Sequence, residues 1–357
     1  MMYKIPLFIL AIYSVSVQAQ FRSYSNEFLN IGVDARAFAM GNAVVADVSD
    51  VNAAYWNPAG LSQIGNDWQA AAMHASYFQS IANYDYVAAA IPLDNQNALG
   101  VSLYRFGVDG IMNTTELIDS QGNIDYDRIS TFSAADYALQ LSYAGNIFNL
   151  PNINFGVNAK MIYRNVGEFA NAYGFGLDAG MQYRKRNFAV GVMVRDITTT
   201  FNAWSINEDA LNQLEIDGII LNEPPEESIE LTLPKIQVGV RQKVDFNQRF
   251  SGTGEIDLNF NLRDGSELVS SSGLSFSPAA GVEIAYDELV FVRAGVNNFQ
   301  NIKDFEGKQS IQFQPNVGVG FKYKGIAIDY ALTDIGDQSI ALYSNIFSVK
   351  IDMEEFY

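Results

Sequence analysis

Cysteine is absent from the sequence of 357 residues, and histidine occurs only once, as His74. Metal sites built from Cys or His are therefore excluded. A serine hydrolase needs a histidine to accept the serine proton, and His74 lies in a predicted strand, away from any Gly-x-Ser-x-Gly turn. The pair Gly174 and Gly176 alternates along a strand and does not form a phosphate-binding loop. We accordingly expect no enzyme activity, no metal site and no cofactor.

Charged residues are also scarce. They make up 17% of the chain, against roughly 25% in an average soluble domain. Positive charge is the scarcer sign, because 22 Lys and Arg stand against 40 Asp and Glu, for a net charge of −18. Nucleic acid is thus excluded as a partner, since binding its phosphates requires concentrated positive charge. Hydrophobic residues reach 48% and aromatic residues 13%, so part of the folded surface is expected to contact something other than water.

After the first 19 residues no apolar run reaches about 18 residues, the length that a membrane-spanning helix needs. Residues 1–19 themselves read as a secretory signal peptide, with Lys4 as the positive region, an apolar core over 5–17 and a small-residue cleavage site before Gln20. An exported, apolar chain without a spanning helix points to a β-barrel, the other structure that satisfies its backbone in lipid.

From Asp67 onward the sequence alternates between apolar and polar residues, most cleanly over Tyr173–Tyr183. Odd positions there are apolar and even positions are Gly, Asp or Gln, which is typical of a strand with one face in lipid. The apolar face of a soluble β-sandwich would alternate in the same way. Tyrosines at both strand ends and the predicted signal peptide favour the outer membrane, with lipid as the first partner.

The alternation predicts an all-β, transmembrane antiparallel β-barrel of about 14 strands. The domains we expect are a signal peptide over 1–19, an N-terminal hatch over 20–66 and an outer-membrane barrel over 67–357. The predicted strands are 68–77, 84–91, 98–106, 134–143, 153–164, 172–184, 187–195, 231–244, 249–262, 278–286, 289–296, 312–323, 326–332 and 343–351. Short turns should lie at the periplasmic end. Long connections, among them 107–133, 198–230, 263–277 and 297–311, should lie outside the cell.

Several predicted inward positions are charged. Because charges inside a barrel of this size usually pair with each other and with a plug, we interpret them as structural. They are Lys160, Asp178, Arg195, Arg241, Asp257, Glu283, Arg293, Lys322, Asp329 and Lys350.

The connection 198–230 combines acidic residues with apolar ones and has no Lys or Arg. Asn207 could cap a short helix over 208–216. Two interpretations stay open, a lid folded over the barrel mouth or a surface for a partner or ligand. The candidate residues are Trp204, Leu211, Leu214, Ile219, Ile220 and Leu221.

The stretch 32–61 is rich in Ala and Gly and lacks strand alternation, which suits a compact plug. Asp50 is expected to cap a helix over 51–56, and Pro58 to end it. The sequence resembles the N-terminal signature of the PorV/PorQ family, FadL-like proteins of the Bacteroidetes type IX secretion system. The resemblance is carried by the run Asp34-Ala-Arg-Ala-Phe-Ala-Met-Gly41, then Ala46 and Asp47, then Asp50, then Asn57-Pro-Ala-Gly-Leu61. The resemblance implies a hatch motif with a structural role, formed by Asp34, Ala35, Arg36, Met40, Gly41, Asn57, Pro58, Ala59 and Gly60.

Two functions follow from the resemblance. In the first, the protein is an accessory outer-membrane barrel that docks or shuttles secreted cargo beside a type IX translocon subunit. In the second, it is a FadL-type passive transporter of hydrophobic small molecules, and the hatch opens a lateral path.

Overall fold

A computed structural model describes residues 25–77, 80–119, 121–146, 150–211, 214–216, 219–222, 228–262, 267–271, 273–303, 309–333 and 344–356. The predicted signal peptide lies outside these residues. The strands are β1 (Gln69–Tyr77), β2 (Ala82–Pro92), β3 (Ala98–Asn113), β4 (Ser130–Gly145), β5 (Ile153–Val166), β6 (Ala170–Lys185), β7 (Phe188–Arg195), β8 (Thr200–Ile206), β9 (Leu214–Ile216), β10 (Ile219–Leu221), β11 (Ile229–Thr232), β12 (Lys235–Asp245), β13 (Phe250–Asn261), β14 (Val269–Ser271), β15 (Leu274–Tyr286), β16 (Val290–Lys303), β17 (Gln309–Tyr323), β18 (Ile326–Thr333) and β19 (Ser344–Asp352).

Helices are few and short. They are α1 (Ala35–Ala39), α2 (Ala53–Trp56) and 3-10 helices at Glu27–Asn30, Pro58–Gln63, Tyr126–Arg128, Glu208–Leu211 and Met353–Phe356. None of the described helices has the length and apolarity to cross a membrane.

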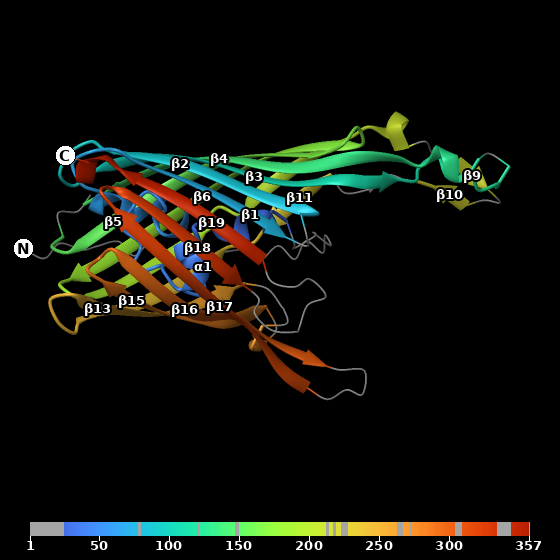
Figure 1. Cartoon of the computed structure of the whole chain (residues 1–357). Helices are drawn as coiled ribbons and strands as arrows, with labels where there is room; N and C mark the ends of the chain where they lie inside the picture. The colour runs from blue at the N-terminus through green and yellow to red at the C-terminus, as the bar shows by residue number, and fades with distance from the viewer. Residues whose placement is uncertain are drawn as a thin grey trace, which may run out of the picture.

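The sheet closes on itself, because β1 pairs with β2 on one side and with β19 on the other. Every pairing along the wall is antiparallel, and β7 with β8, like β11 with β12, makes one interrupted wall strand. The wall is therefore a closed antiparallel barrel of 14 strands, and the predicted fold class is confirmed. Figure 1 shows the tilted strands around the N-terminal segment, drawn in blue.

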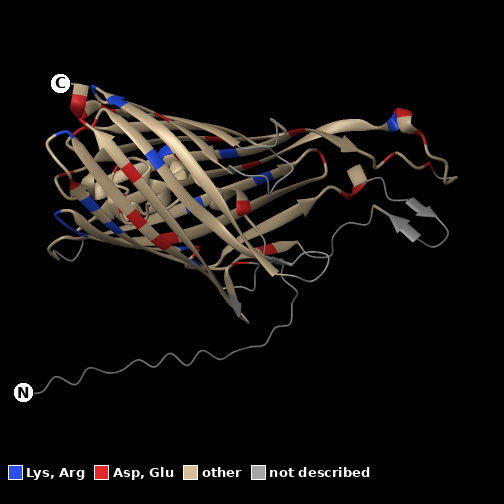
Figure 2. Ribbon diagram, turned by 60° about the horizontal axis from the view of Figure 1, so that its bottom comes forward, with Lys and Arg blue, Asp and Glu red and all other residues tan. Residues whose placement is uncertain are grey.

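The predicted alternation is realised in the wall. On β6, Tyr173 is 65% exposed at the outer face, whereas the inward Asp178 is 2% exposed. Val317, Val319 and Phe321 on β17 are outward in the same way. Figure 2 accordingly shows a wall that is mostly uncharged, with charged positions spaced along single strands and gathered at the ends.

The tight turns lie at one end of the barrel, next to the C-terminus (Figure 1). Between β17 and β18, Lys324 and Gly325 both have positive φ, 46° and 76°, as a two-residue type I′ hairpin requires. The long connections lie at the opposite end. There the β3–β4 hairpin runs beyond the barrel, and Asn222 Nδ2 after β10 donates to Thr115 O at 3.1 Å. We call this projection the arm, and its described residues are 107–119, 121–133, 206–211, 214–216, 219–222 and 228–229.

Several predicted boundaries are wrong. The connection 107–133 is shorter than predicted because β3 continues to Asn113 and β4 begins at Ser130. The connection 198–230 contains β8, β9, β10 and the start of β11, and its predicted helix over 208–216 is only a 3-10 turn followed by β9. Beyond the membrane both strand faces meet water, so the apolar alternation that marks a strand fades there.

Candidate functional site

The bore is filled by residues 25–66, which we call the hatch. Its first half turns at Asp34, whose side chain accepts a hydrogen bond from Arg36 N and so begins α1. Its second half holds α2, which is shorter than predicted. The N-cap position is Asn52, whose side chain makes no cap hydrogen bond, and not the predicted Asp50, whose Oδ1 accepts from Asn52 N at 2.9 Å. Asn57 then fixes the turn into the helix at Pro58, because its Oδ1 accepts from Ala59 N. α1 lies inside the wall in Figure 1.

The hatch backbone touches the wall directly at inward glycines. A Cβ added at Gly281 would lie 2.3 Å from Met40 O, and one added at Gly156 would lie 2.3 Å from Ala59 N. No side chain fits at such distances, so glycine is required at both wall positions. Of the inward glycines in the stretch Tyr173–Tyr183, Gly180 meets Asn57 and Pro58 of the hatch, whereas Gly174 and Gly176 meet Asn202 and Thr200 of β8.

Side-chain amides of the hatch and of the wall add hydrogen bonds to this contact. Asn57 Nδ2 donates to Val45 O at 3.0 Å within the hatch and to Met181 O of β6 at 3.2 Å. Gln140 Nε2 of β4 donates to Ala54 O at 2.6 Å. Wall side chains thus pair the hatch carbonyls that no helix or sheet satisfies.

Ion pairs hold the other side of the hatch. Arg36 pairs with Asp47 and, at 2.9 Å, with Glu283 of β15. Arg241 of β12 lies 2.7 Å from Asp47, and Arg293 of β16 lies 2.6 Å from Glu283. A separate pair joins Lys350 of β19 to Asp50. The predicted pairing of inward charges with each other and with the plug is confirmed for these residues.

The electrostatic consequence is clearest at Asp47. Burial alone would raise its pKa, but the charges of Arg36 and Arg241 bring the pKa well below the usual range. A depressed folded-state pKa stabilises the fold above the unfolded value of roughly 4, and this contribution is lost as the pH falls toward the folded value. The attachment of the hatch is therefore expected to persist at neutral pH and to weaken only in strong acid.

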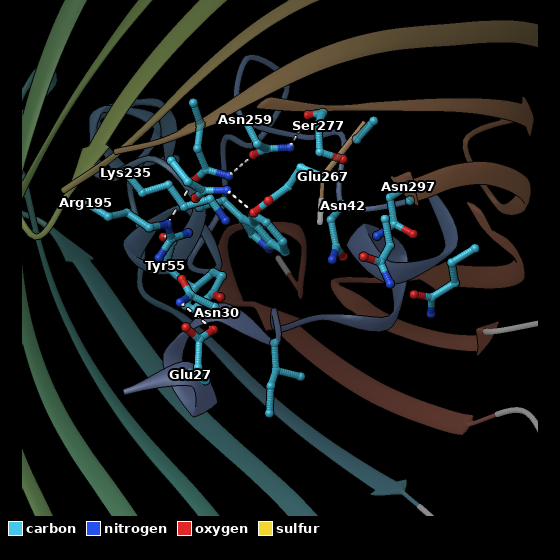
Figure 3. Close-up of a pocket in the computed structure, with 18 residues that line it drawn as sticks. Glu27, Asn30, Asn42, Tyr55, Arg195, Lys235, Asn259, Glu267, Ser277 and Asn297 are labelled. Atoms are coloured by element: carbon cyan, nitrogen blue, oxygen red, sulfur yellow. Dashed lines mark hydrogen bonds between the residues drawn. The ribbon is translucent and has the colours of Figure 1, made fainter. Parts of the chain in front are cut away.

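Two cavities flank the hatch. The base cavity, about 420 Å³, lies toward the tight turns and is lined by charged residues that include Arg36, Asp47 and Lys350. The mouth cavity, about 320 Å³, lies toward the long connections and has Tyr55 and Trp56 among its lining residues (Figure 3). Arg195 of β7 lies at its edge, with its guanidinium 4.2 Å from the Tyr55 ring centre and its Nη2 donating to Tyr55 O at 2.9 Å.

The wall is interrupted beside Arg195. β6 pairs with β7 up to Val194 and with β8 from Phe201, and the residues between form a bulge with positive φ at Asp196 and Thr199. The neighbouring strand breaks at Leu233 and Pro234, where proline lacks an N–H for the ladder. Outside this break is an open depression of about 600 Å³. Its lining includes Leu99, Leu141, Val157, Ala159, Leu177 and Ile197.

A buried ion triad stands behind the break. Lys160 Nζ lies 2.8 Å from Asp178 Oδ1 and 2.7 Å from Asp196 Oδ1, and all three side chains are at most 10% exposed. We expect Lys160→Met to lower the free energy of unfolding by about 3–5 kcal/mol, because two carboxylates then remain buried without their cation. Urea unfolding in lipid vesicles measures this.

The matched control for Lys160 is Lys243→Met. Lys243 lies 2.8 Å from Glu288, but the Glu288 side chain is 66% exposed, so about 0.5 kcal/mol or less is expected. Equal losses in both variants would show that the triad is not a special support of the interrupted wall.

Most of the predicted hatch motif contacts the wall. Ser348 of β19 accepts from Ala35 N and donates to Asp34. Arg36 is in the ion-pair network, Met40 and Gly41 lie against β15 and β16, and Asn57 to Ala59 lie against β5 and β6. Gly60 instead packs within the hatch, where an added Cβ would lie 2.3 Å from Val48 O. Sequence reasoning missed Asp47 as the centre of the network, although it stands in the motif. It also missed the inward amides of the mouth cavity, although Asn259 and Asn261 alternate visibly with apolar residues.

Of the six residues proposed as a partner or ligand surface, the structure describes the side chains of Trp204 and Leu211 and only the backbone of the other four. Trp204 lies in β8 on the inward side, with the Arg164 guanidinium 5.0 Å from its ring centre. Leu211 ends the 3-10 helix of the arm and is half-buried. Leu214 belongs to β9, and Ile219, Ile220 and Leu221 form β10, which pairs with β9.

Comparisons with known proteins agree with this geometry at the level of fold. No protein-family model and no curated protein matches the chain. Among solved structures, it is similar to the toluene transporter TodX of Pseudomonas putida, at 12% identity and a TM-score of 0.55 over 90% of this chain and 98% of that one. The Ralstonia pickettii toluene transporter TbuX has 12% identity and a TM-score of 0.53 over 90% and 98%.

A third similar structure, the monoaromatic hydrocarbon channel CymD, has 11% identity and a TM-score of 0.54 over 90% of this chain and 96% of that one. At identities this low, the similarity concerns the backbone fold and not the binding sites. None of these three structures is named as a member of the PorV/PorQ family. By its closed wall and these neighbours, the chain has the fold of the FadL-like outer-membrane β-barrels.

Proposed function

We propose that the protein is a passive outer-membrane channel of the FadL type, in which the hatch is the gate and small hydrophobic molecules pass between the bore and the membrane at the interrupted wall strand. The observation that carries the proposal is the position of the hatch, which separates two cavities inside a closed wall. The solved neighbours support it, because their names describe toluene transporters and a monoaromatic hydrocarbon channel.

The lateral path is proposed where the ladder of wall hydrogen bonds is interrupted. The apolar depression outside the bulge gives a hydrophobic molecule a place to collect, because its lining includes Leu141, Val157 and Ile197. Residues 196–199 belong to neither β7 nor β8, so the bulge can move without breaking a ladder of strand hydrogen bonds. Two backbone amides of the bulge donate to β6, Ile197 N to Leu177 O at 2.9 Å and Asp196 N to Asp178 Oδ1 at 2.9 Å.

The test is uptake of toluene into lipid vesicles that contain the protein. Ala159→Trp fills the depression from the outer face of β5, and we expect it to slow uptake several-fold. Ala89→Trp is the matched control, because Ala89 is an exposed outward alanine of β2, which takes no part in the depression. Toluene uptake no faster than in protein-free vesicles would refute the channel, and equal slowing by both substitutions would refute this path.

A second candidate function is the docking of a secreted protein beside a type IX translocon, which the family resemblance suggested. The arm favours a protein partner, because three large apolar side chains are exposed there, Met112 at 70%, Ile124 at 58% and Tyr126 at 71%. Purification from the native membrane tests this candidate. Recovery of the protein without a translocon subunit or cargo protein would count against this function. If a partner does co-purify, deletion of the arm should abolish its co-purification.

A further inference from the structure

We propose that the mouth cavity is a binding site for a neutral, hydroxyl-rich ligand of the saccharide class. This proposal concerns binding at the extracellular side of the hatch and does not depend on the transport of hydrophobic molecules. It rests on the chemistry of the cavity wall, which differs from the apolar lining expected for a hydrocarbon.

Amide side chains dominate the mouth cavity. Of its 18 lining residues, eight are Asn or Gln, and they come from the hatch and from the wall strands β12, β13, β16 and β17. Asn30 and Asn42 belong to the hatch, Asn259 and Asn261 to β13, Asn297 to β16 and Gln314 to β17. An amide both donates and accepts hydrogen bonds, as a hydroxyl group does, so this wall matches a ligand with many hydroxyls.

The amides are held in fixed orientations. Arg195 Nε donates to Gln237 Oε1 at 2.8 Å, Gln237 Nε2 to Asn259 Oδ1 at 2.6 Å, and Asn259 Nδ2 to Ser277 O at 3.4 Å. This chain of bonds crosses the cavity wall in Figure 3. A wall ordered in advance loses little side-chain entropy when a ligand binds.

Hydrogen-bonding atoms remain available to a ligand. Asn42 Oδ1 is buried and has no hydrogen-bond partner within the described parts of the chain. Asn297 Oδ1 accepts from Asn316 Nδ2 at 3.0 Å, which sets the amide so that its own Nδ2 is left to donate. Such buried groups are satisfied when water or a ligand occupies the space.

The charges of the cavity favour a neutral ligand. Arg195 and Lys235 are its cations, and Glu27 and Glu267 are its anions, so the formal charges cancel. An aliphatic or aromatic hydrocarbon would displace water from the amides without replacing its hydrogen bonds. The volume of about 320 Å³ is at the lower end of the range for small-molecule sites, roughly 300–1,000 Å³. A small saccharide meets all of these requirements.

Calorimetric titration of the whole protein, refolded in a detergent without a sugar head group, tests the proposal. The probes are neutral mono-, di- and trisaccharides, with toluene as the apolar comparison. We expect at least one saccharide to bind and toluene not to displace it. In the double variant Asn42→Gly, Gln314→Leu, affinity should fall roughly 10-fold or more, because two hydrogen-bonding groups are removed. Glycine keeps the positive φ of residue 42, which is 62°.

Gln63→Ala is the control, because Gln63 is an exposed amide of the hatch that lines the base cavity instead. It should bind the saccharide as the unchanged protein does. Equal thermal unfolding of all the variants shows that they are folded.

The proposal is overturned if no saccharide binds at up to about 10 mM, well beyond ordinary weak affinities. It is equally overturned if the double variant binds unchanged, or if toluene competes for the site. Toluene uptake in vesicles is a separate readout, so either proposal can fail while the other stands.

Discussion

Toluene flux through the double variant Ala54→Cys, Gly100→Cys is expected to fall to the level of protein-free vesicles on oxidation and to recover on reduction. Ala54 is in α2 of the hatch, and Gly100 is an inward residue of β3. A Cβ added at Gly100 would lie 3.8 Å from Ala54 Cβ, within the roughly 3.5–4.5 Å that a disulfide spans. A hatch bonded to the wall cannot move aside, so a channel gated by the hatch must close.

The absence of native cysteine makes this experiment clean, because no other disulfide can form. The single variants Ala54→Cys and Gly100→Cys are its controls and should conduct equally with and without oxidant. Unchanged flux through the oxidised double variant, with the disulfide verified by mass spectrometry, would mean that molecules pass without movement of α2. The gate would then have to be sought at the wall bulge alone.

Replacing Arg36 is expected to have the largest effect on how firmly the hatch is held. Arg36 is the hatch residue that contacts both Asp47 and Glu283. In Arg36→Met these two buried carboxylates lose a shared cation, and we expect the free energy of unfolding in vesicles to drop by about 3 kcal/mol. This is near the lower end for a broken buried pair, because Arg241 and Arg293 still face the carboxylates.

Arg128→Met serves as the comparison for Arg36. Arg128 forms an ion pair on the arm with Asp125 at 3.4 Å, and both side chains are 49% exposed, so its loss should cost about 0.5 kcal/mol or less. If Arg36→Met unfolds at the same urea concentration as the unchanged protein, the ion-pair network does not fix the hatch. The glycine contacts of Met40 and Ala59 would then be its main attachment.

The strands of the wall could be predicted from the sequence because their side chains alternate between the lipid and the barrel interior. Lipid on one side forces every second residue of a strand such as Tyr173–Tyr183 to be apolar, and this pattern needs no knowledge of distant contacts. Tight turns are equally local, since Lys324 and Gly325 set their own backbone conformation. The same rule failed in the arm, where β3 continues to Asn113 and β8 replaces a predicted loop. No lipid imposes alternation there.

The contacts of the candidate site were harder to predict from the sequence. Lys160 was correctly predicted to point inward. Its pairing with Asp196 depends on the bulge between β7 and β8, and no sequence pattern indicated this bulge. Trp204 was grouped with the apolar residues of a loop, yet the pairing of β8 with β6 and β11 turns its side chain inward, toward Arg164. The direction of the Trp204 side chain was therefore decided by strand pairing and not by the apolar residues that follow it in the sequence.

Composition and the period of two residues by themselves determined that this chain is an apolar β-barrel of about 14 strands with a small-residue segment ahead of it. These properties arise from each residue and its neighbours in the strand. Only the tertiary structure decided which wall glycines meet the hatch, which carboxylates share Arg36 and which amides surround the mouth cavity. Those contacts join residues up to about 300 positions apart in the sequence, as Asp50 and Lys350 do, and their partners are chosen by strand register and by the path of the hatch through the bore.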